Sequence, residues 1–332
     1  MDSIKCKGFF KQACQWILAG ILAFIAINII IIPYYHFVPG IPMDKNATGQ
    51  IYYPGSTYLS AAEGYRKDVF DINGYVNDAK NAGYDEYTLV MGSSHTMGKV
   101  VKKGLNFCEI LDEQYGIPTY NMAMDGHLYP DYVKGFDAAL KQFDKSSAIV
   151  MEVNMTRYDI DALRDALIQR EYDPAYEGSN LVNGMSSTDK IKSQVKAWLP
   201  FKLLVKQKID AAGAVSKELN TGTEEEYLAA VNDTMKLMRE KYDKPIIILY
   251  HPDLTLDKEG NIVYTEDEAS KQAFIKAAAD NDIVFEDISD EFTADYLATD
   301  KLPYGFMNTA MGTGHINEEG HRIIAEKLKE LL

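Results

Sequence analysis

Cysteine is scarce in this sequence of 332 residues, which contains three. Cys6 and Cys14 precede a long apolar segment, so Cys108 stands alone in the rest of the chain. A disulfide framework is therefore excluded there, and a folded domain must depend on its core for stability. With 46% hydrophobic and 25% charged residues, the composition is that of a folded protein, and a bacterial surface protein fits it better than a eukaryotic secreted one.

Basic residues are also in deficit, because 34 Lys and Arg face 49 Asp and Glu, for a net charge of −15. Residues 1–35 hold Lys5, Lys7 and Lys11 against Asp2, so the remainder carries −17. Binding of nucleic acid phosphates needs a concentrated excess of Lys and Arg, so we expect no nucleic-acid partner. A strongly acidic balance is typical of a soluble domain that stays dispersed by self-repulsion.

Internal repeats and low-complexity tracts are absent from the sequence. The six histidines show none of the familiar metal-ligand spacings with one another, with carboxylates or with cysteines. We therefore predict no metal site and no cofactor.

One long apolar segment is present, from Trp16 to Pro33, and it contains no charged residue. At about 1.5 Å per residue this length nearly spans a hydrocarbon core of about 30 Å. We predict a transmembrane helix over 16–33. The three preceding lysines place residues 1–15 in the cytoplasm and the main domain outside the cell membrane. A cleaved signal peptide is the alternative, but no small-residue cleavage site follows the segment.

Residues 34–80 are predicted to be a stalk and lead-in. The part over 36–60 is rich in proline and glycine and is expected to be irregular. A domain over 81–332 follows, with a helical insertion at about 157–242.

Short apolar runs alternate with helical patterns through this domain. The runs predict five strands, at 86–91, 118–122, 148–153, 245–250 and 283–285. Helices are expected over 130–143, after capping boxes at Thr223/Glu226 and Thr265/Glu268, and after Asn317. A hairpin is expected to turn at Gly260. The pattern predicts a doubly wound α/β fold with a mainly parallel sheet and a site at the carboxyl ends of the strands.

A serine motif, Gly92-Ser93-Ser94-His95, directly follows the first strand. A serine at a strand-to-helix turn has an exposed hydroxyl, and the helix N-terminus favours developing negative charge. Taken alone, such a motif is more often an ordinary turn.

Three further motifs occupy related places. Gly126 follows the second strand, where a backbone N–H can approach a reacting carbonyl. Asn154 ends the third strand, where its amide can donate to an oxyanion, although asparagine also commonly caps helices. His315 lies in a glycine-flexed loop before the last helix, where a general base can reach a serine.

The order and spacing of these four motifs resemble the signature blocks of the SGNH (GDSL-like) hydrolase superfamily. The resemblance implies a flavodoxin-like three-layer sandwich that acts on ester bonds. It also implies that Ser94 is the nucleophile, that His315 is the base, and that Ser94 N–H, Gly126 and Asn154 form the oxyanion hole.

One departure from this superfamily concerns the acid. Its members usually have an aspartate three residues before the histidine, where this chain has Gly312. The aspartate orients the imidazole, so its loss predicts a Ser–His dyad, an acid from elsewhere or a degenerate site. Asp253 and Asn308 are the possible substitutes.

An anchor followed by an outward SGNH-like domain resembles the proteins of teichoic-acid D-alanylation and of alginate O-acetylation. That resemblance implies a membrane-bound O-acyltransferase as partner and a cell-surface polysaccharide or teichoic-acid-like polymer as acceptor. The segment 190–208 holds six lysines and no acid among apolar residues, which suits either a membrane or partner interface or a helix packed on the domain.

Two classes of function therefore remain. The first is a membrane-anchored serine acyltransferase or esterase of the cell envelope. The alternative is a non-catalytic accessory protein for a membrane-bound O-acyltransferase, and Gly312 is the main reason to consider it.

Overall fold

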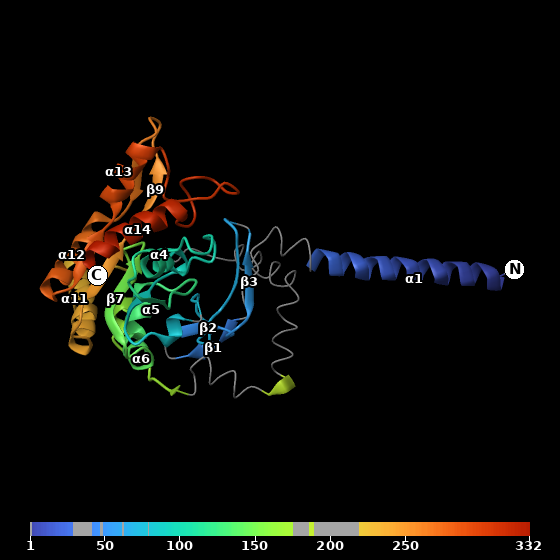
Figure 1. Ribbon diagram of the computed structural model, residues 1–332, viewed down its shortest axis with the longest axis horizontal. Helices are drawn as coiled ribbons and strands as arrows, with labels where there is room; N and C mark the ends of the chain where they lie inside the picture. Colours follow the sequence, from blue (N-terminus) through green and yellow to red (C-terminus); the bar gives the residue numbers. More distant parts are fainter. Residues whose placement is uncertain are drawn as a thin grey trace.

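The computed structural model describes residues 2–28, 42–46, 49–61, 63–78, 80–174, 186–188 and 219–332. Its centre is a five-stranded parallel sheet in the order β11-β8-β7-β5-β6 (Figure 1). The strands are β5 (Tyr87–Met91), β6 (Thr119–Asn121), β7 (Ser146–Val153), β8 (Ile246–Tyr250) and β11 (Val284–Asp287). In chain order this is the 2-1-3-4-5 arrangement of flavodoxin-like folds, so the predicted α/β class with a mainly parallel sheet is confirmed.

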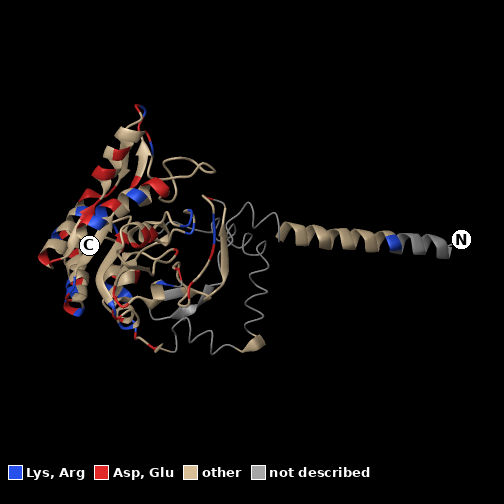
Figure 2. Cartoon of the chain, viewed as in Figure 1, with Lys and Arg blue, Asp and Glu red and all other residues tan. Residues whose placement is uncertain are grey.

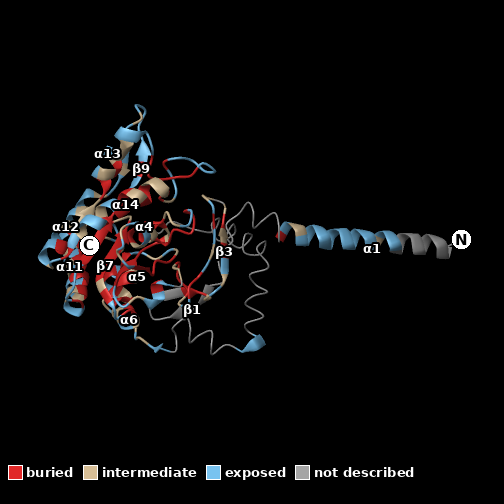
Figure 3. Ribbon diagram, viewed as in Figure 1, coloured by how far each residue is buried: buried red, intermediate tan, exposed pale blue. Residues whose placement is uncertain are grey.

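The central strands are apolar on both faces, as expected for a parallel sheet covered on both sides. Leu89, Ile149 and Ile248 point into one core, while Val90 and Val150 point into the other. This alternation follows from the two-residue period of a strand. Figure 3 shows the buried residues concentrated along the sheet and on the helix faces turned toward it.

Helices cover both faces and complete three layers. One face packs against α5 (Tyr129–Lys134), α6 (Phe136–Gln142), α7 (Ile160–Ala166), α11 (Glu224–Lys241) and α12 (Glu268–Asp280). The other packs against α4 (Phe107–Gln114), α13 (Ser289–Thr299) and α14 (Glu318–Leu331). The hairpin of β9 (Asp253–Leu256) and β10 (Ile262–Thr265) follows β8, with Gly260 in its turn as predicted.

The prediction of an irregular stalk over 36–60 is wrong for the residues that the structure describes. They include β1 (Pro42–Asn46), β2 (Gly49–Tyr52) and β3 (Thr57–Ser60); β1 pairs with β2, and β3 pairs with β4 (Arg66–Val69). Ile51, Tyr58 and Phe70 are buried in the same core as the sheet. The lead-in is therefore part of the domain, which does not begin at residue 81. A short 3-10 helix, η2 (Asn81–Gly83), connects it to β5.

Two helix predictions need correction. The helix expected over 130–143 is two helices, which meet at Gly135. The capping box expected at Thr265/Glu268 is also wrong, because Thr265 ends β10 and the side chain of Asp267 caps α12 through Ser270 N–H. The box at Thr223/Glu226 is confirmed at the start of α11.

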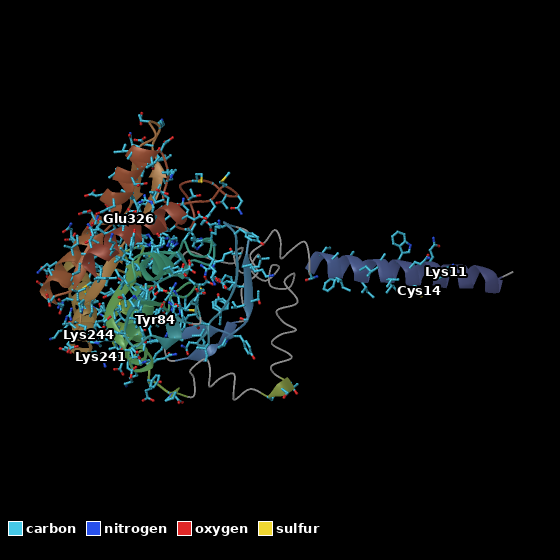
Figure 4. The ribbon with its side chains drawn as sticks, in the orientation of Figure 1. Lys11, Cys14, Tyr84, Lys241, Lys244 and Glu326 are labelled. Carbon is cyan, nitrogen blue, oxygen red and sulfur yellow. The ribbon has the colours of Figure 1, made fainter. Side chains whose placement is uncertain are left out.

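The N-terminal helix, α1 (Asp2–Ala26), extends away from the domain in Figure 1. Residues 12–28 hold no charged side chain, and Figure 2 shows most of α1 in tan, in contrast to the mixed charges of α11 to α14. Lys11 and Cys14 project from it clear of the domain (Figure 4). None of the helices within the described residues has the length and apolarity needed to span a membrane. Residues 29–33 of the predicted span lie outside the described residues.

The helical insertion predicted at 157–242 is described mainly at its two ends, by α7 and α11. The lysine-rich segment 190–208 lies outside the described residues.

Candidate active site

The site forms where β5, β6 and β7 end at the same edge of the sheet. β5 lies between β7 and β6, so Ser94, which follows β5, is flanked in the fold by Gly126 after β6 and Asn154 after β7. The chain reverses its winding direction between β5 and β7, and ligands of open α/β sheets bind at such a switch point. The topology therefore brings these three sequence motifs to one place.

Ser94 opens α3 (Ser94–Met97), a single helical turn capped by Ser93. The Oγ of Ser94 lies 2.9 Å from Nε2 of His315, within hydrogen-bonding distance. The two residues are 221 positions apart in the chain. The predicted pair is thus in contact, in the geometry that proton transfer from a hydroxyl to a histidine requires.

A carboxylate that the sequence analysis missed completes this arrangement. Oε2 of Glu63 lies 2.5 Å from Nδ1 of His315, and Oε1 of Glu63 accepts the backbone N–H of His315 at 2.7 Å. The Nδ1 contact leaves Nε2 free to accept the Ser94 proton, as in a serine–histidine–acid triad. Neither Asp253 nor Asn308 orients His315 directly, so that prediction is wrong for both residues.

Asn308 instead holds the loop that carries Glu63. Its side-chain oxygen accepts Gly64 N–H at 2.9 Å, and its amide donates to the carbonyls of Ala61 and Gly64 at 3.0 and 3.1 Å. Asp253 is exposed at the start of β9. Asn308 is therefore a positioning residue for the acid.

The backbone explains why position 312 carries no acid. Gly312 has φ +80°, a left-handed conformation that side chains other than glycine rarely adopt, and its N–H bonds the carbonyl of Tyr304. An aspartate there would strain the loop. The acid comes instead from Glu63 in the lead-in.

The contacts of Glu63 keep it ionised. Partial burial on its own would raise the pKa of Glu63, but its hydrogen bonds with the His315 ring and backbone outweigh burial and hold the pKa below its usual value. An ionised Glu63 stabilises the imidazolium that forms when His315 accepts a proton.

Gly314 makes close approach of Glu63 to His315 possible. A Cβ at position 314 would lie 2.2 Å from Glu63 Oε1, and Gly314 has φ +82°. We expect Gly314→Ala to displace the carboxylate and to lower kcat by about 10², the loss that a shift of about 1 Å can cause. Ester turnover and the melting temperature measure the two effects.

Gly116→Ala is the matched control, because Gly116 also has a positive φ, +67°, but has no atom within 4 Å of the added Cβ. Both variants carry backbone strain of about 1–3 kcal/mol. Equal kcat values for the two variants would contradict the close-contact explanation.

Three hydrogen-bond donors face no partner at this edge of the sheet. The structure gives no hydrogen bond from Ser94 N–H, Gly126 N–H or the Asn154 side chain to any residue of the described chain. Asn154 is half-buried and Gly126 is exposed. The donors that the resemblance assigns to an oxyanion hole are thus available to a ligand.

The lead-in also holds the turn that contains Gly126. Asp125 accepts hydrogen bonds from Tyr52 at the end of β2 and from the buried Lys99 after α3. Lys99 Nζ also donates to the Tyr52 hydroxyl at 2.9 Å. Burial lowers the pKa of Lys99, although Asp125 opposes this shift. These contacts connect the Gly126 turn to the turn of Ser94.

Behind Ser94 lies a buried carboxylate, Glu152 on β7, which is 1% exposed. It accepts hydrogen bonds from Ser93 and Thr96 on one oxygen and bonds His251 at 2.9 Å on the other. His95 is also buried here, and burial together with the nearby His251 lowers its pKa to about 3. His95 is therefore neutral, and its Nδ1 accepts Ile316 N–H at 3.3 Å.

Of the groups that the sequence analysis missed, Glu152 left a signal. It interrupts the otherwise apolar strand AIVMEV, and an acid in a buried strand requires a buried partner. Glu63 gave no such signal in the sequence, because it lies in the lead-in, which was predicted to be separate from the domain. Among the described side chains, no group of three or more His, Cys, Asp or Glu is arranged to hold a metal ion.

No protein-family model and no curated protein sequence matches this chain. Solved structures resemble it in outline. A protein from Desulfitobacterium hafniense assigned to the G-D-S-L lipolytic family aligns with 74% of this chain and 99% of its own, at 12% identity and a TM-score of 0.37. A lipase/acylhydrolase from Enterococcus faecalis aligns over 74% and 97%, at 12% identity and a TM-score of 0.36.

The salicylyl-acyltransferase SsfX3 of a tetracycline biosynthetic pathway aligns with 74% of this chain and 54% of its own, at 11% identity and a TM-score of 0.37. A function for the present chain must come from the geometry of its own side chains.

Proposed function

We propose that this protein is a serine esterase or O-acyltransferase in which Ser94 is the nucleophile, His315 the general base and Glu63 the acid that orients His315. One observation carries the proposal: the hydroxyl, imidazole and carboxylate form a continuous hydrogen-bonded chain, with distances of 2.9 and 2.5 Å. The three groups come from a strand-to-helix turn, a loop before the last helix and the lead-in.

The reaction follows from these positions. Nε2 of His315 takes the Ser94 proton while the serine oxygen attacks the ester carbonyl carbon, and the carbonyl oxygen becomes an oxyanion. When this intermediate collapses, the ester bond breaks and the leaving alcohol receives the proton from His315. Water or a second hydroxyl, activated by His315, then attacks the acyl-Ser94 ester and restores the free serine. Water gives an acid as product, and an acceptor hydroxyl gives a new ester.

Asn154 is expected to bind the oxyanion together with the backbone N–H groups of Ser94 and Gly126. Asn154→Ala should lower kcat by about 10²–10³ with little change in KM, because the lost hydrogen bond strengthens in the transition state. The melting temperature should change little, since the Asn154 amide bonds no residue of the described chain. A loss of less than threefold in kcat would remove Asn154 from the oxyanion hole.

Glu63 also bears on the non-catalytic alternative. An accessory role was favoured by the absence of an acid at Gly312, and that support is lost when Glu63 bonds His315. We therefore favour the enzyme.

The acceptor and the location extend the proposal. We propose that the enzyme acts on O-acyl groups of a cell-surface glycan or polyol, outside the membrane, beside a membrane-bound O-acyltransferase. The uncharged segment 16–33, with lysines before it, supports an anchored, outward-facing chain.

A serine-directed fluorophosphonate tests the proposed chemistry. The full-length chain should be labelled on one residue, and peptide mapping should place the label on Ser94. The rate of p-nitrophenyl acetate hydrolysis should fall in proportion to the fraction of the chain that the fluorophosphonate has labelled. A folded wild-type chain that neither reacts nor hydrolyses would favour the accessory role.

Transferase and esterase differ in their use of an acceptor. Added polyols should divert the acyl group from water to the polyol hydroxyl in a transferase, and the ratio of the two products measures this. A ratio that does not respond to any polyol would identify an esterase.

A further inference from the structure

Glu152, His251 and Tyr304 form a buried hydrogen-bonded chain beneath the turn of Ser94, and the proposed mechanism does not use it. All three side chains are nearly inaccessible, with exposures of 1%, 0% and 1%. Glu152 comes from β7, His251 follows β8, and Tyr304 lies in the loop that leads to His315. The chain therefore joins three separate segments around the nucleophile.

Glu152 holds the nucleophile turn at three points. Its Oε2 accepts the Ser93 backbone N–H at 2.6 Å, the Ser93 hydroxyl at 2.8 Å and the Thr96 hydroxyl at 3.1 Å. Ser93 caps the single turn α3 and Thr96 lies within it, so the two residues stand on either side of Ser94 in the chain. Holding both residues fixes the backbone position of Ser94.

Tyr304 holds the other side of the His251 ring. Its hydroxyl lies 2.6 Å from Nδ1 of His251 and 3.0 Å from the carbonyl oxygen of Pro252. Nε2 of His251 lies 2.9 Å from Oε1 of Glu152. Because a carboxylate accepts hydrogen bonds, Nε2 carries the hydrogen that His251 donates to Glu152.

An ionised Glu152 fits this assignment. Only a carboxylate without a proton can accept from Ser93, Thr96 and His251 together. Burial alone would raise the pKa of Glu152, but the hydrogen bond and charge of His251, with smaller contributions from His95 and Ser93, lower it to about 2. The other titratable side chains that interact with this pair are Tyr132, Tyr158, Tyr304, His95 and His321.

We propose that Glu152 and His251 form a buried hydrogen-bonded pair that positions Ser94 for reaction, acting through Ser93 and Thr96, with Tyr304 holding His251. This inference rests on the proposed function, since it assigns Ser94 the role of nucleophile. Glu152 and His251 are positioning residues, because neither contacts Ser94 Oγ or His315 in the described structure.

The hydrogen-bonded pair is tested by nuclear magnetic resonance of the full-length chain labelled with ¹⁵N-histidine. His251 should carry hydrogen on Nε2, the ring nitrogen that faces Glu152. Its signals are identified by their loss in His251→Gln. In Glu152→Gln, the Nε2 signal should shift, because a neutral amide replaces the carboxylate. An Nε2 without hydrogen in the wild-type chain would overturn the pair, whether or not the chain is an enzyme.

Positioning is tested by the rate of fluorophosphonate labelling in Tyr304→Phe and Tyr129→Phe. Tyr129 is the matched control, because it is equally buried, at 0% exposure, and its hydroxyl bonds Thr234 at 2.8 Å. Both variants remove a buried hydroxyl and should lower the melting temperature. Tyr304→Phe alone should slow labelling, by between about 10- and 100-fold, because His251 loses a hydrogen-bond partner and the nucleophile turn shifts.

The outcomes separate the two proposals. If the wild type is labelled, and neither Tyr304→Phe nor Tyr129→Phe changes the labelling rate, the positioning role is overturned. The proposed function then remains intact. Absence of labelling in the wild type would overturn the proposed function and the positioning role with it. Since Tyr304→Phe removes one oxygen atom, the test does not depend on the folding of Glu152→Gln.

Discussion

Ser94→Ala is expected to abolish ester turnover and fluorophosphonate labelling, with kcat lower by about 10⁶. The Oγ atom of Ser94 forms the acyl ester, so no other group can replace it in the same mechanism. Ser94 is also the residue whose Oγ bonds His315 at 2.9 Å. The fold should be retained, because Ser93, and not Ser94, caps α3 and bonds Glu152. Turnover of p-nitrophenyl acetate and the melting temperature provide the two measurements.

Ser289→Ala is the control for this variant. Ser289 likewise opens a helix, α13, where it is buried and its hydroxyl bonds Asp287 at 2.5 Å. The Ser289→Ala variant should be labelled by the fluorophosphonate at the wild-type rate. Substantial turnover in Ser94→Ala would show that another group carries the chemistry.

Glu63→Gln should lower kcat by about 10⁴, as loss of the acid does in serine–histidine–acid triads. Glutamine has one carbonyl oxygen, and the backbone N–H of His315 already takes that position at 2.7 Å. The amide nitrogen would then face Nδ1 of His315, which favours the tautomer that carries hydrogen on Nε2. That tautomer cannot accept the Ser94 proton. Steady-state kinetics should show the loss in kcat with KM little changed.

Asp68→Asn serves as its control, because Asp68 is another half-buried carboxylate of the lead-in, paired with Arg66 at 2.9 Å. It should affect stability and leave kcat unchanged. If the two variants lose kcat equally, Glu63 acts only by holding the lead-in in place.

The pH dependence of stability gives a second readout for Glu63. Since its pKa is lowered on folding, its ionised form stabilises the fold at pH above the usual glutamate value, and this contribution is lost as the pH falls through the lowered pKa. Glu63→Gln should therefore melt below the wild type near neutral pH, and the difference should disappear in acid. A difference that persists in acid would mean that the carboxylate charge is not its cause.

The sheet and the Ser94–His315 pair could be predicted because their signals are local. Apolar runs such as PIIILY indicate buried parallel strands, and the strand order then brings the segments after β5, β6 and β7 to one edge. The glycine-flexed loop before α14 placed His315 within reach of that edge. Each inference needed only a short stretch of sequence and one rule of α/β topology.

The acid could not be predicted, because its place depends on contacts between distant segments. Glu63 lies between β3 and β4, in a region whose prolines and glycines concealed its strands. Its loop is held by Asn308, which is 244 residues away from Gly64 in the chain. Asn308 was predicted to lie near His315, and it does lie at this site. It bonds the loop that carries Glu63, however, and not His315 itself. The helix break at Gly135 lies inside a stretch whose apolar helical periodicity continues across it, so periodicity alone predicted one helix.

The origin of the acid in the lead-in has a practical consequence for any shortened version of this protein. A fragment that begins at residue 81 would keep the entire parallel sheet, the serine and the histidine, yet it would lack Glu63 and also Tyr52, the hydroxyl that bonds Asp125 beside Gly126. Such a fragment, chosen by sheet boundaries, would be an incomplete enzyme, and its inactivity would say nothing about the intact chain.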